Sequence, residues 1–141
     1  MDRVVLDTNI FISGIAIASS SSGHIINAWR ENTFVLVISP QILTEIREVL
    51  LRPTIMNFTG LSKDEVNEFI FEIEQRSYVT EGTYEVTKIQ TDPDDNDILA
   101  CALEGYATHI VTGDTKSLLP LKDYHGIRIL TPTDYMRQRQ V

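Results

Sequence analysis

The sequence is poor in several features, and each shortage excludes a class of protein. Cys101 is its only cysteine, so no disulfide can form within the chain, and we expect a reducing, cytoplasmic location. No apolar run approaches the ~20 residues that a membrane-spanning helix requires, so we expect no membrane partner. The first predicted strand begins almost at Met1, and we therefore expect no signal peptide.

Positive charge is also scarce. The 12 Lys and Arg residues are outnumbered by 20 Asp and Glu residues, which gives a net charge of −8. Proteins that bind nucleic acids usually carry an excess of positive charge. Two explanations remain: the partner is not a nucleic acid, or carboxylates converge on a divalent metal ion that reverses the local field. An acidic chain also favours a basic protein as its partner.

Several common catalytic motifs are missing as well. The sequence has no Gly-rich phosphate-binding loop, and no serine lies in a nucleophile elbow. Its three histidines, His24, His109 and His125, are scattered without the spacing of metal ligands, so we expect them to be structural or exposed. The acidic residues are left as the candidates for chemistry.

Apolar strands and amphipathic helices alternate along the chain. Strands are predicted at 4–6, 34–38, 109–112 and 127–130, with a short strand or an extended connection at 84–89. Helices are predicted at 24–30, 40–51, from a capping box at 62–65, at 94–105 and from 132, with a helical turn at 117–120 and a flexible loop at 19–23. This alternation predicts an α/β fold, a three-layer α/β/α sandwich with a central, mainly parallel sheet, in one domain over residues 1–141.

Two aspartates directly follow predicted strands. Asp7 ends the strand at 4–6, and Asp114 lies just after the strand at 109–112. The ends of parallel strands share one edge of a sheet, and ligands bind there in open parallel sheets, so we expect the two carboxylates to lie together. Asp7 also has a structural interpretation, as the cap of the turn that follows it.

Two more acidic residues face the apolar sides of predicted helices. Glu45 borders the apolar stripe of the helix at 40–51. On a helical wheel at roughly 100° per residue, Asp95 lies on the buried face of its helix and Asp97 on the outer face. A buried carboxylate without a partner is costly, which favours a function for Asp95. Asp94 and Asp97 have structural interpretations instead, as the N-cap and as a first-turn acid that favours the helix dipole.

Carboxylates gathered at one edge repel one another unless they are protonated or bound to cations. Oxygen ligands suit hard ions, so Mg²⁺ or Mn²⁺ is the expected metal. Such ions bind substrate phosphates while a carboxylate-oriented water attacks, which suggests metal-assisted hydrolysis of a phosphodiester. Thr8, Asn9 and Thr112 would supply supporting hydrogen bonds, although turn chemistry explains them equally well.

Four segments of the sequence form a recognisable set. They are Val5-Leu6-Asp7-Thr8-Asn9, Ser39-Pro40 with Glu45, Asp92-Pro93-Asp94-Asp95-Asn96 and Val111-Thr112-Gly113-Asp114. In this order and spacing they resemble the PIN-domain family, and within it the toxin components of prokaryotic toxin–antitoxin pairs. The resemblance runs from Val4 to about Pro132 and implies a parallel sheet between helices.

The resemblance also implies a Mg²⁺- or Mn²⁺-dependent ribonuclease. Carried over by motif, its metal-binding and catalytic residues would be Asp7, Glu45, Asp95 and Asp114, with Asp97 as the minority candidate for the third acid. The supporting residues would be Thr8, Asn9, Thr112 and Asp92. The implied partners are an RNA substrate, a cognate antitoxin protein that blocks the cleft, and a second copy of the chain in a homodimer.

Two other functions stay open. A catalytically weak or inactive PIN-like module that binds protein or RNA would suit the negative charge, because few cations are expected near the proposed edge: Arg30, Arg47, Arg52, Lys116 and Lys122. A Mg²⁺-dependent phosphatase of haloacid-dehalogenase type also places an aspartate after its first strand. Its second acid would stand two positions later, where this chain has Asn9, and that absence counts against it.

Overall fold

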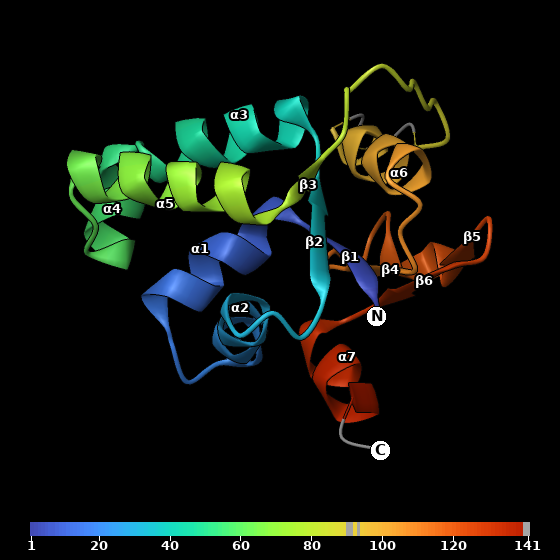
Figure 1. Ribbon diagram of the computed structural model, residues 1–141, viewed down its shortest axis with the longest axis horizontal. Coiled ribbons are helices and arrows are strands. Elements are labelled where there is room, and N and C mark those ends of the chain that lie inside the picture. The colour runs from blue at the N-terminus through green and yellow to red at the C-terminus, as the bar shows by residue number, and fades with distance from the viewer. Residues whose placement is uncertain (90–91, 93, 140–141) are drawn as a thin grey trace.

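A six-stranded sheet forms the centre of the computed structural model, which describes residues 1–89, 92 and 94–139 (Figure 1). Its strands are β1 (Arg3–Leu6), β2 (Val35–Ile38), β3 (Tyr78–Val79), β4 (His109–Val111), β5 (Asp123–Tyr124) and β6 (Ile127–Leu130). Their order is β3-β2-β1-β4-β6-β5, and all neighbours are parallel except β5 and β6. The predicted α/β fold with a mainly parallel sheet is confirmed.

Helices cover both faces of this sheet. They are α1 (Thr8–Ala16), α2 (Ser21–Arg30), α3 (Pro40–Leu50), α4 (Pro53–Thr59), α5 (Lys63–Arg76), α6 (Asp95–Glu104) and α7 (Pro132–Arg139), with a 3₁₀ turn, η1, at Leu119–Leu121. Helices α1, α2 and α7 lie below the sheet in Figure 1, while α3, α5 and α6 lie above it, and α4 packs against α1 and α3. This arrangement gives the three predicted layers.

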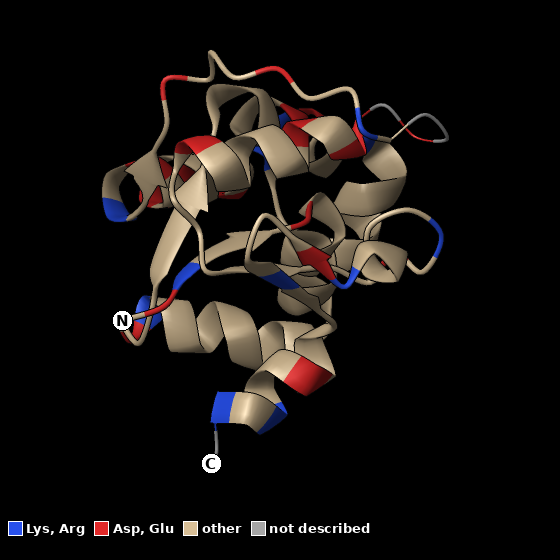
Figure 2. Cartoon of the chain, turned by 90° about the vertical axis from the view of Figure 1, so that its right-hand side faces the viewer, with Lys and Arg blue, Asp and Glu red and all other residues tan. Residues whose placement is uncertain are grey.

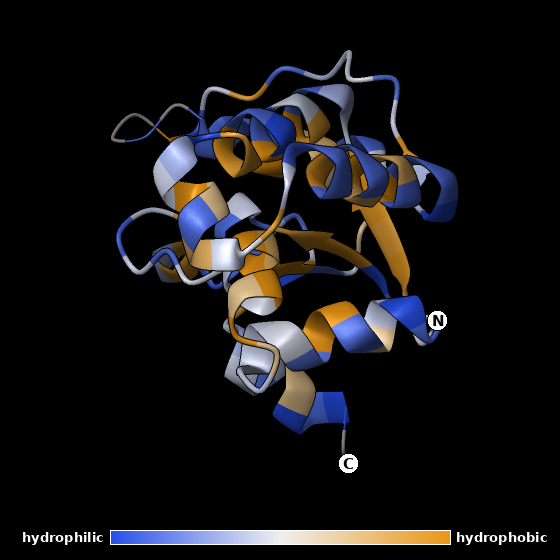
Figure 3. Cartoon of the chain, turned by 90° about the vertical axis from the view of Figure 1, so that its left-hand side faces the viewer, coloured by the Kyte–Doolittle hydropathy of each residue, from blue (hydrophilic) through white to orange (hydrophobic). Residues whose placement is uncertain are grey.

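The strands are apolar because both of their faces are covered. Val4, Val5 and Leu6 of β1 are at most 1% exposed. Figure 3 shows the strands as hydrophobic segments between helices whose outer sides are hydrophilic. No single helix in the described part of the chain is long and apolar enough to span a membrane, and α1 with α2 reaches that length and composition only as a pair bent by 97°.

The predicted capping is confirmed at the starts of α3 and α5 but not at that of α2. The Ser39 side chain accepts a hydrogen bond from the backbone N–H of Ile42 at 3.2 Å and begins α3, and the capping box at 62–65 begins α5. Helix α2, however, begins at Ser21, before the predicted residue 24. The cause is Ser20, whose hydroxyl accepts a hydrogen bond from the N–H of Gly23 at 3.1 Å, so most of the predicted loop is helical.

Residues 84–89 form no strand; the edge strand is β3 instead, which pairs with β2. We call residues 80–89 the strap, because they lie along α6. The N–H of Gly82 and the hydroxyl of Thr83 donate to the Glu104 carboxylate at 3.0 and 2.9 Å, and the side-chain amide of Gln41 donates to the carbonyl of Gly82 at 2.7 Å. The strap leads directly into the acidic motif around residue 95.

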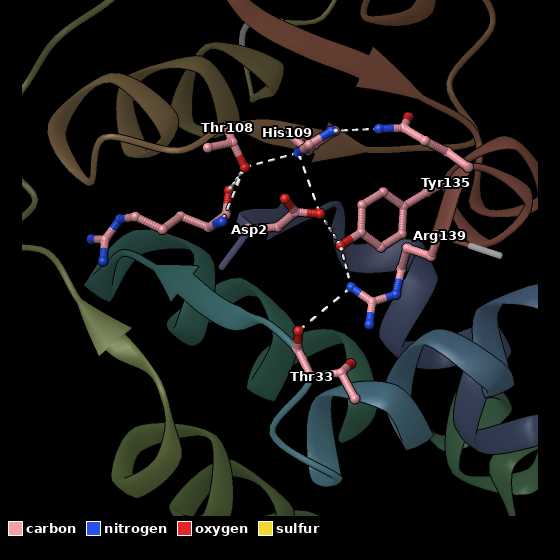
Figure 4. Close-up of polar contacts among 8 residues, drawn as sticks. Asp2, Thr33, Thr108, His109, Tyr135 and Arg139 are labelled. Atoms are coloured by element: carbon pink, nitrogen blue, oxygen red, sulfur yellow. Dashed lines mark hydrogen bonds and ion pairs between the residues drawn. The ribbon is translucent and has the colours of Figure 1, made fainter. Parts of the chain in front are cut away.

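The edge of the sheet where strands begin joins the first and last elements (Figure 4). Asp2 accepts a hydrogen bond from the hydroxyl of Tyr135 in α7 at 2.9 Å, and Arg139 donates to that hydroxyl at 3.2 Å. His109, the first residue of β4, is buried here, with its Nδ1 2.8 Å from the Thr108 hydroxyl and 3.9 Å from an Asp2 oxygen. This histidine is structural, in agreement with the sequence.

Candidate functional site

A cleft of about 660 Å³ lies at the opposite edge, where the parallel strands end. Its lining is acidic and comes from four distant parts of the chain: Asp7, Thr8, Asn9, Ser13, Glu45, Val49, Arg52, Asp92, Asp94, Asp95, Ile98, Gly113 and Asp114. The four acids named from the sequence, at positions 7, 45, 95 and 114, therefore share one cavity. Their convergence follows from the parallel sheet, which delivers its strand ends and the next helix starts to one side.

Asp7 is held between β1 and α1. Its Oδ1 accepts a hydrogen bond from the N–H of Thr8 at 2.7 Å, and its Oδ2 accepts one from the hydroxyl of Thr112 at 2.7 Å. Asp7 is also the N-cap of α1, so its structural and cleft-lining roles coexist. Burial raises the pKa of this carboxyl; the hydrogen bonds from Thr112 and Thr8 oppose burial, while the charge of Asp114 adds to it.

Asp114 lies in the loop after β4. The hydroxyl of Thr112 accepts a hydrogen bond from its N–H at 2.9 Å while donating to Asp7, so one buried threonine links both acids. The Asp114 carboxylate accepts hydrogen bonds from the N–H groups of Lys116, Ser117 and Leu118 at 2.9, 3.2 and 3.3 Å. Although burial acts to raise its pKa, the hydrogen bond with Asp95 and these amides outweigh burial, and the pKa of Asp114 is lowered.

Asp95 is the first residue of α6 and only 7% exposed, in agreement with its predicted place on the buried face. Its buried Oδ2 accepts no hydrogen bond from any described residue. Burial, the hydrogen bond with Asp114 and the charge of Asp7 raise the pKa of Asp95 to about 8. A buried carboxylate without a donor is costly, so this oxygen needs either a proton or a cation.

Glu45 reaches the cleft from α3. The hydroxyl of Thr8 donates to its Oε2 at 3.1 Å, which links it to the residue that follows Asp7. Burial raises the pKa of Glu45, the hydrogen bond from Thr8 lowers it, and the charge of Asp7 raises it again. Glu45 is half-buried, as its position beside the apolar stripe of α3 predicts.

The other acids of the motif are placed less deeply. Asp97 is exposed, as the helical wheel predicts, and it is not among the residues that line the cleft. Asp94 occupies the N-cap position of α6 but makes no side-chain cap hydrogen bond, because its backbone is already helical (φ −64°, ψ −27°); its predicted capping role is wrong. Asp92 lines the cleft, whereas Thr91 and Pro93 of the same motif lie outside the described residues.

Positive charge at the cleft is confined to one side chain in the described part of the molecule. Arg52, between α3 and α4, lines the cleft. Of the other cations that the sequence placed near this edge, Arg30 instead pairs with Glu72 of α5 at 2.9 Å and Arg47 lies beside Phe71 in a different groove. Figure 2 shows acidic segments gathered in the upper half of the view, around the strap and α6.

The sequence interpretation missed two polar residues. Ser13 lines the cleft four residues after Asn9. Residues four apart lie on the same face of a helix, so this spacing of two polar residues in a mostly apolar helix could have predicted that Ser13 faces the cleft. Asn96 follows Asp95 in the acidic motif, and the sequence predicted no function for it. Its side chain bonds to the strap, a contact that no local pattern announces.

The donor set suits a hard divalent ion, since it consists of carboxylate, hydroxyl and amide oxygens. The unpaired Oδ2 of Asp95 is the observation in favour of such an ion. Across the described residues, however, no three His, Cys, Asp or Glu side chains are already arranged as a metal site. Asp7 and Asp114 accept hydrogen bonds from the protein, which fix the orientation of their carboxylates and leave further lone pairs on the oxygens.

Comparison with known proteins adds the family. The PIN domain family model matches residues 3–116, a span that includes all four acids. The chain is 27% identical over 144 residues to the uncharacterized protein MJ1680 of Methanocaldococcus jannaschii, covering 96% of this chain and 90% of that protein. Its fold is similar to a chain in the crystal structure of VapBC2 from Rickettsia felis bound to a DNA fragment from their promoter, with a TM-score of 0.58, 16% identity, and coverage of 90% of this chain and 96% of that chain. The chain belongs to the PIN-domain family.

Proposed function

We propose that this protein is a metal-dependent endoribonuclease, the toxin of a toxin–antitoxin pair, which hydrolyses RNA phosphodiester bonds in the cytoplasm. The observation that carries the proposal is the cleft at the strand ends, where Asp7, Glu45, Asp95 and Asp114 converge and where one buried carboxylate oxygen accepts no hydrogen bond from the described residues. A cluster of this kind is built for cations, because the carboxylates otherwise repel one another.

The residues take different roles in this proposal. Asp7, Asp95 and Asp114 would hold Mg²⁺ or Mn²⁺, which supplies charge neutralisation for the scissile phosphate when it is bound. Glu45 would complete the ligands or accept a proton from the attacking water; its raised pKa, caused first by burial, suits a group that takes up a proton. Thr112 keeps Asp7 and Asp114 in register through its two hydrogen bonds, and Thr8 does the same for Asp7 and Glu45.

Substrate would enter a cleft whose charge is almost entirely negative. Arg52 is the one cation among the described residues that line it, so we assign Arg52 to a phosphate of the RNA beside the scissile bond. Asn9 and Ser13 add neutral hydrogen-bonding groups on the same side of α1. Few phosphate contacts imply a weak, salt-sensitive association and a narrow footprint on RNA.

The proposed protein partner is an antitoxin. The structure from Rickettsia felis is, by its title, that of VapBC2 bound to a promoter DNA fragment, and its fold is similar to that of this chain. An antitoxin with a basic segment would complement the net charge of −8 and the acidic cleft. We also propose that the chain, as one domain over residues 1–141, forms a homodimer.

A second function is favoured by one observation. The same charge balance, with a single described cation in the cleft, also fits a PIN-like module that binds a partner and cuts nothing. Such a module would bind Mn²⁺ without turnover on any nucleic acid. The phosphatase alternative has no supporting contact in the cleft, since Asn9 stands where its second acid is required.

The experiment that tests the proposal is an Mn²⁺ titration with RNA cleavage measured in the same samples. The wild type is compared with Asp95→Asn and with Asp97→Asn, an exposed acid on the same helix that serves as the matched control. We expect metal-dependent cleavage that Asp95→Asn abolishes and Asp97→Asn retains. Metal binding without cleavage of RNA or single-stranded DNA would favour the binding module, and equal activity of Asp95→Asn and wild type would reject the site.

A further inference from the structure

Asn96 makes a two-point contact between α6 and the strap. Its Oδ1 accepts a hydrogen bond from the N–H of Ile89 at 2.8 Å, and its Nδ2 donates to the carbonyl oxygen of the same residue at 2.8 Å. A side-chain amide that satisfies both backbone groups of one residue fixes distance and orientation together. Ile89 is itself 7% exposed and belongs to the hydrophobic core, so Asn96 is tied to a firm point.

This contact lies at the start of helix α6, which has no side-chain cap. Asp94 makes no side-chain cap hydrogen bond, and the first backbone bonds of the helix are tight turns, from Asp95 N–H to Asp92 O at 3.0 Å and from Asp97 N–H to Asp94 O at 3.1 Å. Helix starts without a side-chain cap fray more easily. The side chain of Asn96, in the first turn of α6, instead attaches the helix start to the strap.

Asp95, the residue before Asn96 in α6, is surrounded by other acidic side chains. Asp95 is buried next to Asp7 and Asp114, and its Oδ2 accepts no hydrogen bond from the described chain. Asp95 therefore lies among other carboxylates, which favour its displacement from the cleft. The bonds from Asn96 to Ile89 hold the start of α6 beside the cleft.

We propose that Asn96 is a positioning residue of the cleft, which holds Asp95 in place for a divalent cation by clamping the start of α6 to Ile89 of the strap. The proposal rests on the proposed function for the role of Asp95, but the clamp itself is a property of the fold. Asn96 touches neither the cleft nor the substrate; it acts through the backbone of its neighbour.

The test compares the two ends of the strap. Asn96→Ala removes both bonds to Ile89, and Asn96→Asp removes the donated one while keeping the size of the side chain. Glu104→Ala is the matched control, because it removes the hydrogen bonds that Gly82 and Thr83 of the strap donate to the far end of α6. Mn²⁺ affinity is measured by electron paramagnetic resonance of the free ion, and amide hydrogen exchange is measured in metal-free protein.

We expect Asn96→Ala to weaken Mn²⁺ binding about 10-fold, as the loss of an outer support does in other metal sites, and to lower kcat while KM for RNA changes little. Amide exchange of residues 95–98 should quicken in the same variant. Asn96→Asp, which sets a carboxylate oxygen against the carbonyl oxygen of Ile89, should quicken this exchange at least as much as Asn96→Ala. Glu104→Ala should quicken exchange in the strap and leave Mn²⁺ affinity unchanged.

The proposal is overturned if Asn96→Ala binds Mn²⁺ as tightly as the wild type, or if Glu104→Ala weakens binding as much as Asn96→Ala does. If the wild type binds no Mn²⁺ at all, the proposed function fails. The exchange rates of residues 95–98 then decide the clamp alone: unchanged rates in Asn96→Ala and Asn96→Asp would reject it as well.

Discussion

At the scale of single residues, the buried surroundings of Asp95 favour the neutral, protonated form of its carboxyl group. Burial, the bond with Asp114 and the charge of Asp7 raise the folded pKa of Asp95 from 3.8 to about 8. The folded state therefore holds a proton that the unfolded chain has already lost, and folding stability falls as pH rises between these two values. The ionised form of Asp95, which the proposed cation would need, is therefore the form that destabilises the metal-free fold.

Asp95→Asn should therefore stabilise the metal-free protein. In EDTA we expect the Tm of the wild type to fall as the pH rises from about 4 to about 8, while that of Asp95→Asn stays higher, by roughly 5 °C at the alkaline end. Added Mn²⁺ should raise the Tm of the wild type and leave the variant unchanged, because only a ligand of the folded state stabilises it. Scanning calorimetry with and without EDTA checks both; an equal Mn²⁺ shift in the two proteins would contradict the assignment.

Arg52→Ala should weaken RNA binding without removing the reaction. One charge-assisted contact to phosphate contributes about 1.5–3 kcal/mol, so we expect KM to rise about 10-fold or more and the dependence of KM on salt to become shallower. Arg52→Lys should recover part of the loss, since lysine keeps the charge but not the planar fork. Lys122→Ala, a cation outside the cleft lining, is the control, and steady-state kinetics at two salt concentrations is the measurement.

At the scale of elements, the turn between α1 and α2 depends on a residue without a side chain. A Cβ on Gly23 would lie 2.3 Å from the carbonyl oxygen of Ala18 and 2.6 Å from its carbonyl carbon, so the backbone itself is in the way. The absence of a Cβ lets the first turn of α2 close onto the end of α1, where Ser20 caps it. This close approach holds α2 against α1, the helix that Asp7 caps.

Gly23→Ala should accordingly destabilise the protein by about 2 kcal/mol, the usual cost of forcing extra volume into a packed contact. The measurement is the midpoint of urea unfolding, read by circular dichroism. Gly113→Ala is the matched control, because a Cβ there meets no atom within 4 Å. Equal midpoints for the two variants would mean that the contact between α1 and α2 can accommodate the extra methyl group without loss of folding stability, which would contradict the prediction.

Elements with a strong local signal were predictable from the sequence. The apolar strand 4–6, the Ser39 cap and the capping box at 62–65 each carry their signal within a few residues, and the wheel placed Asp95 inside and Asp97 outside. The start of α2 and the strap were not predictable, because serine-rich and alternating segments satisfy several local conformations and tertiary contacts decide among them. The contact of Asn96 with Ile89 was missed for the same reason, whereas Arg52 was correctly expected near this edge.

At the scale of the whole molecule, the two edges of the sheet are differently equipped. The strand-end edge carries the acidic cleft, while the strand-start edge carries the Asp2–His109–Tyr135 contacts that join β1, β4 and α7 (Figure 4). Burial lowers the pKa of His109; the charge of Asp2 opposes burial, and that of Arg128 adds to it. Protonation of this histidine therefore costs folding stability.

His109→Gln should remove an acid-side loss of stability. Because the folded pKa lies below the unfolded value of 6.5, the wild type loses stability as pH falls through 6.5 and on to the lower folded pKa, and is unaffected above that window. We expect the Tm of the wild type to drop more steeply than that of His109→Gln below about pH 6.5. His24→Gln, at an exposed position on α2, should follow the wild type; a parallel pair of curves for wild type and His109→Gln would contradict the prediction.

The order of the strands also sets when the cleft can arise on the ribosome. β1 lies between β2 and β4, so Val4 pairs with Leu36 early in the chain and with His109 much later. A nascent chain must therefore wait for β4 before its first strand has both neighbours, and for Asp114 before the fourth acid is present. Translation delivers Asp7 and Glu45 long before Asp95 and Asp114, so an unfinished copy of the chain has only half of these four acids of the cleft.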